Sequence, residues 1–261
     1  MRHPTAAGLP ARDLVPTVRV PGGRFRMGCA RGRPDEGPEH RVQVAAFRLG
    51  RTPVTRGQYA PFLSATATPA PPWWSDPAFG DPAQPVVGVT WSEACAFADW
   101  LGSRVGGRWR LPTEAEWERA ARGGLDGAPT AWGDALPEGE VPAGPLVAPW
   151  PTGRGRPNGY GLLDAGTIVH EWCLDWYAAD YYARSPERDP RGPDGGERRA
   201  SRGGSWRHHV RWSPPSARSS LPPSFRYADY GFRVLRERGR SARVEAHADG
   251  GARGYSPGST W

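Results

Sequence analysis

Histidine side chains around residue 208 are the groups in this sequence best suited to metal chemistry. Of the six histidines, His208 and His209 are adjacent and follow Ser205 closely. Imidazole nitrogens bind zinc, copper, iron and nickel. Neighbouring residues on a strand point to opposite faces, so only one of the two histidines can enter a given site unless the segment is a loop. With His170, and with His40 as a further candidate, they would form a histidine metal site; the alternative is surface or hydrogen-bonded core imidazoles.

Acidic side chains and cysteines are the other groups that could do chemistry. Helix capping and exposure on a helix surface account for Glu114, Glu116 and Glu118. We interpret a further set of aspartates as solvated loop charges, namely Asp175, Asp180, Asp189 and Asp194. The three cysteines are odd in number and widely spaced, which argues against a disulfide framework and fits a reducing compartment. We expect buried thiols without a nucleophilic role at Cys29, Cys95 and Cys173.

Three capped helices are predicted to position these groups. A Thr followed three residues later by Glu or Gln is a capping box, and the sequence contains one at each of Thr55, Thr90 and Thr113. The third box predicts a short helix that ends at Gly123-Gly124. The second predicts a helix over 94–101 closed by Gly102. The first predicts a helix of about two turns, because Pro61 is tolerated only near a helix start.

Extended segments and long loops make up the rest of the predicted structure. Alternating or β-branched and aromatic residues predict strands within 15–27 and 40–48, at 168–177 and at 230–235. Segments rich in Gly, Pro or charged residues predict loops at 66–84, 125–156 and 180–197. We expect a loose arm over 1–14, one domain over 15–236 and a disordered tail over 237–261.

Composition bounds the class of protein and its partners. Gly 35 and Pro 30 in 261 residues indicate a turn-rich fold, and 13 Trp argue against a disordered chain. All 34 basic residues are Arg, which is typical of a GC-rich bacterial genome, so the net charge of +7 is no argument for nucleic acid. No apolar run is long enough to cross a membrane or to form a secretory signal, so we expect a cytoplasmic protein without membrane contact. The oligomeric state is left open.

Five motifs in fixed order then indicate a family. They are Arg-Leu-Pro-Thr-Glu-Ala-Glu-Trp-Glu at 110–118, Asn-Gly-Tyr-Gly-Leu at 158–162, Glu-Trp-x-x-Asp-Trp at 171–176, Arg-Gly-Gly-Ser-Trp at 202–206 and Gly-Phe-Arg at 231–233, beside Gly-Gly-x-Phe-x-Met-Gly at 22–28. Together they resemble the formylglycine-generating enzyme family, also called the sulfatase-modifying factor domain. The resemblance covers about residues 15–236. It implies an α+β, C-type-lectin-like fold of short twisted antiparallel strands, few helices and much irregular structure.

The resemblance also implies an activity that this sequence does not support. Members that make formylglycine oxidise a cysteine of a sulfatase, with copper held by two cysteines after the Gly-Gly-Ser-aromatic motif. Here His208 occupies the position of the first cysteine and Ser213 lies near that of the second. We therefore expect no copper and do not transfer the oxidase activity. Related sulfoxide synthases hold iron through a separate histidine-bearing domain, for which this chain has only His3 and His40 before residue 170.

A structural calcium site is a second implication of the resemblance. In the family an Asx side chain, two backbone carbonyls and a Glu carboxylate bind calcium, and the corresponding residues here are Asp164, Thr167, Val169 and Glu171. Hard oxygen donors of this kind suit Ca²⁺. The family's Gly-Asn is replaced by Thr167-Ile168. The alternative is a pair of carboxylates that accept hydrogen bonds from local N–H groups.

Two hypotheses about function follow. The favoured one is a calcium-stabilised, non-oxidase scaffold that binds a peptide, protein or other ligand, because Arg and aromatic side chains are typical of binding hot spots. The residues predicted to form its surface are Trp206, Arg207, His208, His209, Arg211, Trp212, Arg218, Phe225, Arg226, Tyr227 and Tyr230. The alternative is a metal-dependent oxidoreductase of the same family that uses histidine ligands, with Ser205 and His208 in catalysis.

Overall fold

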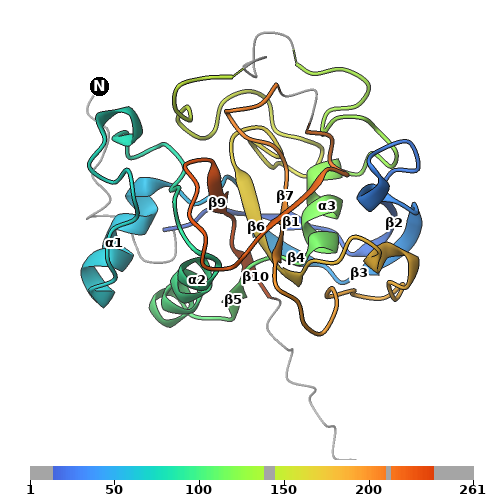
Figure 1. Cartoon of the computed structure of the whole chain (residues 1–261), viewed down its shortest axis with the longest axis horizontal. Helices are drawn as coiled ribbons and strands as arrows, with labels where there is room; N and C mark the ends of the chain where they lie inside the picture. Colours follow the sequence, from blue (N-terminus) through green and yellow to red (C-terminus); the bar gives the residue numbers. More distant parts are fainter. Residues whose placement is uncertain (1–13, 138–144, 210–212, 238–261) are drawn as a thin grey trace, which may run out of the picture.

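Three small sheets and three helices make up the part of the chain that the structure describes. A computed structural model describes residues 14–137, 145–209 and 213–237 (Figure 1). One four-stranded sheet has the order β1-β4-β10-β5, and a two-stranded sheet pairs β2 with β3. The bounds of these strands are β1 Thr17–Val20, β2 Gly23–Met27, β3 His40–Val44, β4 Phe47–Gly50, β5 Trp109–Arg110 and β10 Leu235–Arg236. All pairs in these two sheets are antiparallel.

The third sheet has the order β8-β7-β6-β9 and carries the candidate site. Its strands are β6 His170–Trp176, β7 Arg199–Arg202, β8 Arg218–Leu221 and β9 Tyr230–Phe232. β6 and β9 run parallel, with His170 opposite Tyr230, whereas β6–β7 and β7–β8 are antiparallel. Alternate side chains of β6 enter different parts of the core: Trp172 packs with residues of the first two helices, and Cys173 with the cluster around α3.

All three predicted helices are present, and each begins with a complete capping box. They are α1 Arg56–Thr66, α2 Trp91–Val105 and α3 Glu114–Arg122, with short 3-10 turns at Pro34–Glu36, Pro77–Phe79 and Tyr181–Ala183. Within the described residues, no helix combines the length and apolar character needed to cross a bilayer. Most of the predicted arm and tail lies outside the described residues.

Two predicted helix ends are wrong. α1 has 11 residues and contains Pro61, because Tyr59 and Phe62 bury their rings against Phe97 of α2 and so stabilise the later turns. α2 continues through Gly102 to Val105 and is followed by Gly106, whose positive φ of 78° favours glycine. Gly102 is instead a site of close approach, since a Cβ there would lie 2.9 Å from the carbonyl oxygen of Gly107.

Charged residues that we expected at the surface are buried. Glu114 and Glu118 of α3 are 2% and 0% exposed, so their interpretation as helix-surface acids is wrong. They are ion-paired with Arg202 of β7, and Glu114 also with Arg218 of β8. Asp175 is 3% exposed on β6 and accepts the N–H of Glu114, so it is not a solvated loop charge. The predicted surface loop at 180–197 likewise contributes two buried side chains to the core, Tyr181 and Tyr182.

The cap of α2 provides a first test. Thr90 Oγ1 accepts the N–H of Glu93, and Glu93 accepts the N–H of Thr90. We expect Thr90→Ala to lower the free energy of unfolding by about 1 kcal/mol, because the part-buried N–H of Glu93 loses its acceptor. Urea denaturation measures the change. Thr90→Ser keeps the acceptor and serves as the control; equal stability of all three proteins would contradict the assignment.

Candidate metal site

His170 begins strand β6 with one ring nitrogen already engaged. Its Nδ1 lies 2.8 Å from the carbonyl oxygen of Gly203, which can only accept, so Nδ1 carries the proton. Nε2 is then the unprotonated nitrogen and faces the ring of His208. The backbone at Gly203 passes close to Gly166: an added Cβ on Gly203 would lie 2.8 Å from the Cα of Gly166, and the φ of Gly203 is 78°. Only glycine fits this position without strain. The backbone thus orients the imidazole as ligating histidines usually are oriented.

His208 lies in the turn that follows β7 and completes a histidine pair. Its backbone N–H donates to the carbonyl of Ser205 at 2.9 Å, which holds the turn. Its Nε2 is 3.2 Å from Nε2 of His170, and its side chain is 48% exposed. The segment is a loop, so the strand argument that excludes one of two adjacent histidines does not apply; nevertheless His209 is not part of the group.

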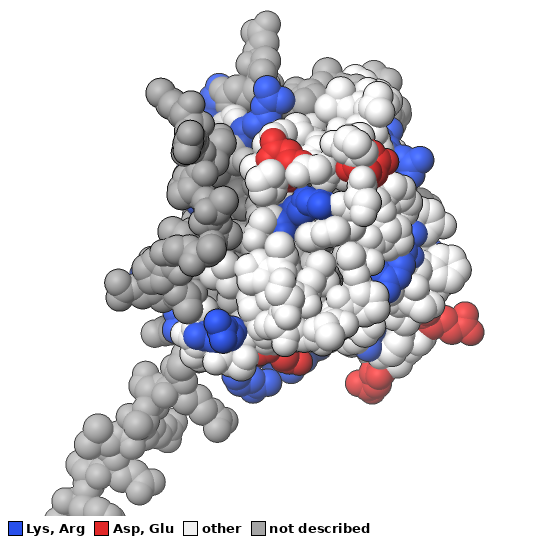
Figure 2. All heavy atoms as spheres, turned by 90° about the vertical axis from the view of Figure 1, so that its left-hand side faces the viewer, with Lys and Arg blue, Asp and Glu red and all other residues white. Residues whose placement is uncertain are grey.

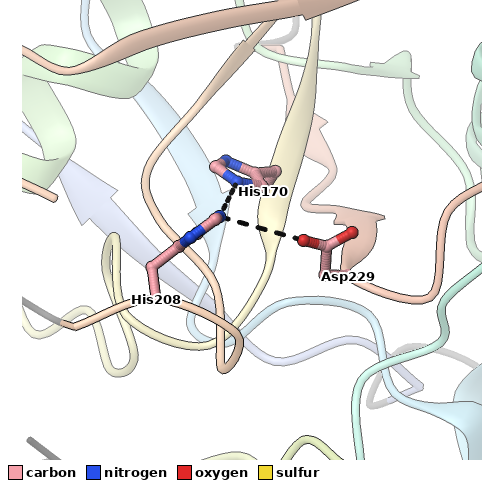
Figure 3. A group of neighbouring side chains, drawn as sticks. All are labelled: His170, His208 and Asp229. Atoms are coloured by element: carbon pink, nitrogen blue, oxygen red, sulfur yellow. Dashed lines mark hydrogen bonds and ion pairs between the residues drawn. The ribbon is translucent and has the colours of Figure 1, made fainter. Parts of the chain in front are cut away.

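Asp229 supplies the third side chain from the residue just before β9 (Figure 3). Its Oδ2 accepts a hydrogen bond from Ser205 Oγ at 3.0 Å and lies 4.0 Å from His208 Nε2. Its backbone carbonyl accepts the N–H of His170 at 2.9 Å, which ties the two residues together. Figure 3 shows both imidazoles and the carboxylate converging from β6, the turn after β7 and the start of β9.

The environment keeps His170 neutral. Burial lowers the pKa of His170 to about 4; Asp229 acts in the opposite direction, and His208 in the same direction as burial. A neutral imidazole is the form that binds a metal. Asp229 is 6% exposed and contributes the one carboxylate of the group.

The spacing of the three ligand atoms suits one ion with modest rearrangement. They lie within 4.8 Å of one another and are the only group of three or more His, Cys, Asp or Glu among the described residues with such spacing. For ion–nitrogen distances of about 2.1 Å, the two imidazole nitrogens would subtend an angle of about 100°, and Asp229 would need to move inward by about 1 Å. Two histidines and one carboxylate with open positions are the ligand set of non-haem iron sites.

Sequence reasoning identified part of this group. The sequence predicts His208, His170 and Ser205 as site residues, and the structure brings them together. Asp229 was missed, although it lies only two residues before the Gly-Phe-Arg motif. His40, the further candidate, lies elsewhere: its Nδ1 is 2.9 Å from the carbonyl of Pro38 and its ring packs on Tyr182.

Around this group, the predicted ligand surface is exposed only in part. Phe225 and Tyr227 are 46% and 41% exposed, and their rings stack. Trp206 and Tyr230 are buried, and Arg218 is 1% exposed and paired with Glu114, so their placement on the surface is wrong. Arg226 is engaged by Glu93. Arg211 and Trp212 lie outside the described residues. The face that carries α1 is largely uncharged, with blue and red side chains scattered across it (Figure 2).

The residues predicted to bind calcium are buried and engaged with protein groups. Both carboxylate oxygens of Glu171 lie within 3.0 Å of Arg233 Nε, and one also accepts Trp117 Nε1. Asp164 has a φ of 56° and accepts the N–H of Gly153 at 2.6 Å. Thr167 and Val169, which lie between Asp164 and Glu171 in the sequence, are buried as well. Arg233 therefore already provides positive charge at this place, and the calcium site stays a prediction.

The chain is similar to known proteins over most of its length. Residues 5–238 match the sulfatase-modifying factor enzyme 1-like domain family. The chain is 35% identical to the formylglycine-generating enzyme of Streptomyces coelicolor, over 90% of this chain and 95% of that protein. It is 34% identical to the enzyme of the same name from Thermomonospora curvata, over 83% and 91% respectively. The solved structure of PvdO from Pseudomonas aeruginosa has a TM-score of 0.76 at 28% identity, covering 91% of this chain and 100% of that one. These findings confirm the α+β, C-type-lectin-like fold class.

Proposed function

This chain belongs to the formylglycine-generating enzyme family of sulfatase-modifying factor domains, and we propose that it is a metal-dependent oxidoreductase with histidine ligands. The observation that carries the proposal is the convergence of His170, His208 and Asp229 within 4.8 Å. A redox-active ion such as iron would supply oxygen-dependent oxidation from the positions that the protein leaves open. We prefer this function to the non-oxidase scaffold because three side chains of two metal-binding types, imidazole and carboxylate, converge on one place.

The protein's own groups have separable roles in this proposal. The carbonyl oxygen of Gly203 accepts a hydrogen bond from His170 Nδ1 and so leaves Nε2 as the nitrogen that would bind an ion. Ser205 donates to Oδ2 of Asp229, which orients the carboxylate; Ser205 is thus a positioning residue and not a nucleophile. The buried ring of Tyr230 packs on the His170 ring, with centroids 4.9 Å apart, and shields the inner side of the group from water. His208 forms the exposed side, where a substrate would approach.

The absence of cysteine near His208 determines which metal we favour. The three cysteines are residues 29, 95 and 173, and none follows Ser205. Thiolates favour Cu(I), whereas two histidines and one carboxylate with open positions are the ligand set of non-haem iron sites. Burial raises the pKa of Cys173 well above its ordinary value, which disfavours the thiolate form at that position. We therefore expect iron and not copper as the physiological metal.

Metal analysis tests the proposal directly. We expect stoichiometric iron in protein purified without chelator, and we expect His208→Ala to weaken metal affinity by more than about 100-fold, beyond the loss typical of outer-shell changes. His209→Ala is the matched control, since His209 is the adjacent imidazole outside the group. Elemental analysis and isothermal titration calorimetry provide the measurements. Calcium as the sole metal, with no oxygen consumption on cysteine-containing peptides, would instead favour the non-oxidase scaffold.

The non-oxidase scaffold is the second candidate, and the stacked, exposed pair Phe225 and Tyr227 supports it. Large aromatic side chains that remain exposed are common at protein-binding sites. In that case replacement of both rings by alanine would abolish ligand binding and leave metal affinity unchanged, whereas the oxidoreductase depends on His208 and on the metal that it would bind. The two functions therefore predict opposite sensitivities of the same protein.

A further inference from the structure

Arg207 lies at the mouth of the candidate metal site, and its side-chain contacts among the described residues are weak ones to Asp229 and Trp206. Its Nη1 is 3.9 Å from Oδ1 of Asp229, and its guanidinium is 5.6 Å from the ring of Trp206. The side chain is 51% exposed, whereas that of Asp229 is 8% exposed. A long, exposed ion pair of this kind contributes little to stability. The ion pair between Arg207 and Asp229 therefore contributes little to the stability of the fold.

Metal binding would change the charge balance that Arg207 experiences. Without an ion, Asp229 offsets the charge of Arg207. A divalent ion on two neutral imidazoles and one carboxylate leaves a net positive charge beside the guanidinium. The ion and Arg207 would then face the same opening, and among the described residues Asp229 is the one acidic partner of Arg207.

We infer that the metal-loaded site binds an organic carboxylate between the open metal position and Arg207. This inference rests on the proposed function, because the second positive charge is that of the ion. The guanidinium matches the two oxygens of a carboxylate, and an anion relieves the repulsion between ion and Arg207. The carbon body of the ligand has aromatic surface available nearby, since Tyr230 contacts both the His170 ring and the exposed ring of Tyr227.

The inference predicts reciprocal coupling between two ligands. If an ion increases the affinity for a carboxylate, the carboxylate must increase the affinity for the ion by the same factor. Coupling of this kind is commonly about 5-fold to 150-fold. Arg207→Gln should remove most of the coupling while it leaves metal affinity equal or slightly higher, because the repulsion is gone. If Arg207 had a role in folding alone, Arg207→Gln would change neither the coupling between ion and carboxylate nor the metal affinity.

Isothermal titration calorimetry on the full chain tests this, with Zn²⁺ as a redox-inactive probe and succinate as the carboxylate. We expect succinate to bind the zinc-loaded protein at least about 5-fold more tightly than the metal-free protein. Succinamide, which has the same length without charge, should show no coupling. A blocked peptide with a central glutamate distinguishes a polypeptide side chain from a free acid as the source of the carboxylate, and binding of either supports the inference.

Matched variants separate failure of this inference from failure of the proposed function. Arg24→Gln is the control, because Arg24 is an exposed arginine on strand β2 and pairs with Glu187. Strand β2 lies away from β9 (Figure 1). Zinc binding with the same succinate affinity in the presence and absence of zinc would overturn the inference alone. Coupling that persists in Arg207→Gln would also overturn it. Absence of zinc binding to the unaltered protein would overturn both proposals.

Discussion

Replacement of Glu171 by leucine is expected to lower the free energy of unfolding by about 3–5 kcal/mol. Glu171 and Arg233 are both 0% exposed, and Arg233 donates to the carboxylate at 2.9 and 3.0 Å. Loss of the carboxylate leaves a buried guanidinium without its counter-charge and leaves Trp117 Nε1 without its acceptor. Burial raises the pKa of Glu171, and Arg233 and Trp117 oppose that effect. Urea denaturation monitored by tryptophan fluorescence measures the change.

A double variant distinguishes the cost of the orphaned charge from the value of the pair. Glu171→Leu with Arg233→Met removes both charges, so we expect it to be more stable than Glu171→Leu alone. A double variant as unstable as the single variant would contradict this explanation. The same denaturation in calcium and in EGTA tests the predicted calcium site: stabilisation by calcium that Glu171→Leu removes would support it, and equal stability of the unaltered protein in both would exclude it.

Arg202→Met is expected to have an effect of similar size, about 3–5 kcal/mol, because Glu118, Tyr182 and the carbonyl of Pro215 all lose a buried, charged hydrogen-bond donor. Arg202 is 0% exposed and donates to Glu118, to Tyr182 and to the carbonyl of Pro215 at 2.5, 2.8 and 2.6 Å. It connects β7 to α3 and to the loop before β8. Its removal leaves the carboxylate of Glu118 with Arg122 as its ion-pair partner. The exposed pair formed by Arg24 and Glu187 provides the control, and Arg24→Met should change stability by less than about 0.5 kcal/mol.

The effect of Arg202→Met should depend on pH in a defined direction. Burial raises the pKa of Glu118, but Arg202 and Arg122 outweigh burial and hold the pKa below its ordinary value of 4.5. A depressed pKa in the folded state means that Glu118 stabilises the fold above pH 4.5 and loses this contribution as pH falls through the folded-state pKa. The difference between the variant and the unaltered protein should therefore be largest near pH 7 and smaller near pH 3. A constant difference across this range would show that the charge of Glu118 is not responsible.

Local sequence signals predicted the start of each helix well and the end of two helices poorly. The capping boxes at Thr55, Thr90 and Thr113 involve contacts three residues apart, so the sequence contains all the information they need. The ends of α1 and α2 depend on partners distant in sequence. Phe97 packs on the turns around Pro61, and the carbonyl of Gly107 approaches Gly102. A rule based on proline and glycine alone cannot include these contacts.

Burial of charge was the main feature that sequence reasoning missed. Glu118 and Arg202 are 84 residues apart and meet because α3 packs on β7. Glu and Arg are residue types that usually lie at the surface, so neither residue by itself indicates burial. In the structure each neutralises the other inside the core, which is why both can be fully buried. The same applies to Arg218, whose Arg type suggested a binding surface but whose carboxylate partner is 104 residues away.

The sequence by itself determined the family, the fold class and the chemical identity of His208, because ordered motifs and side-chain types are local properties. Only the tertiary structure decided that His208 meets His170 and Asp229, residues 38 and 21 positions away along the chain. The parallel pairing of β6 with β9 brings Asp229 beside His170, and the turn after β7 adds His208. Such a group depends on strand order and loop path, and these are set by packing of the whole domain and not by any one segment.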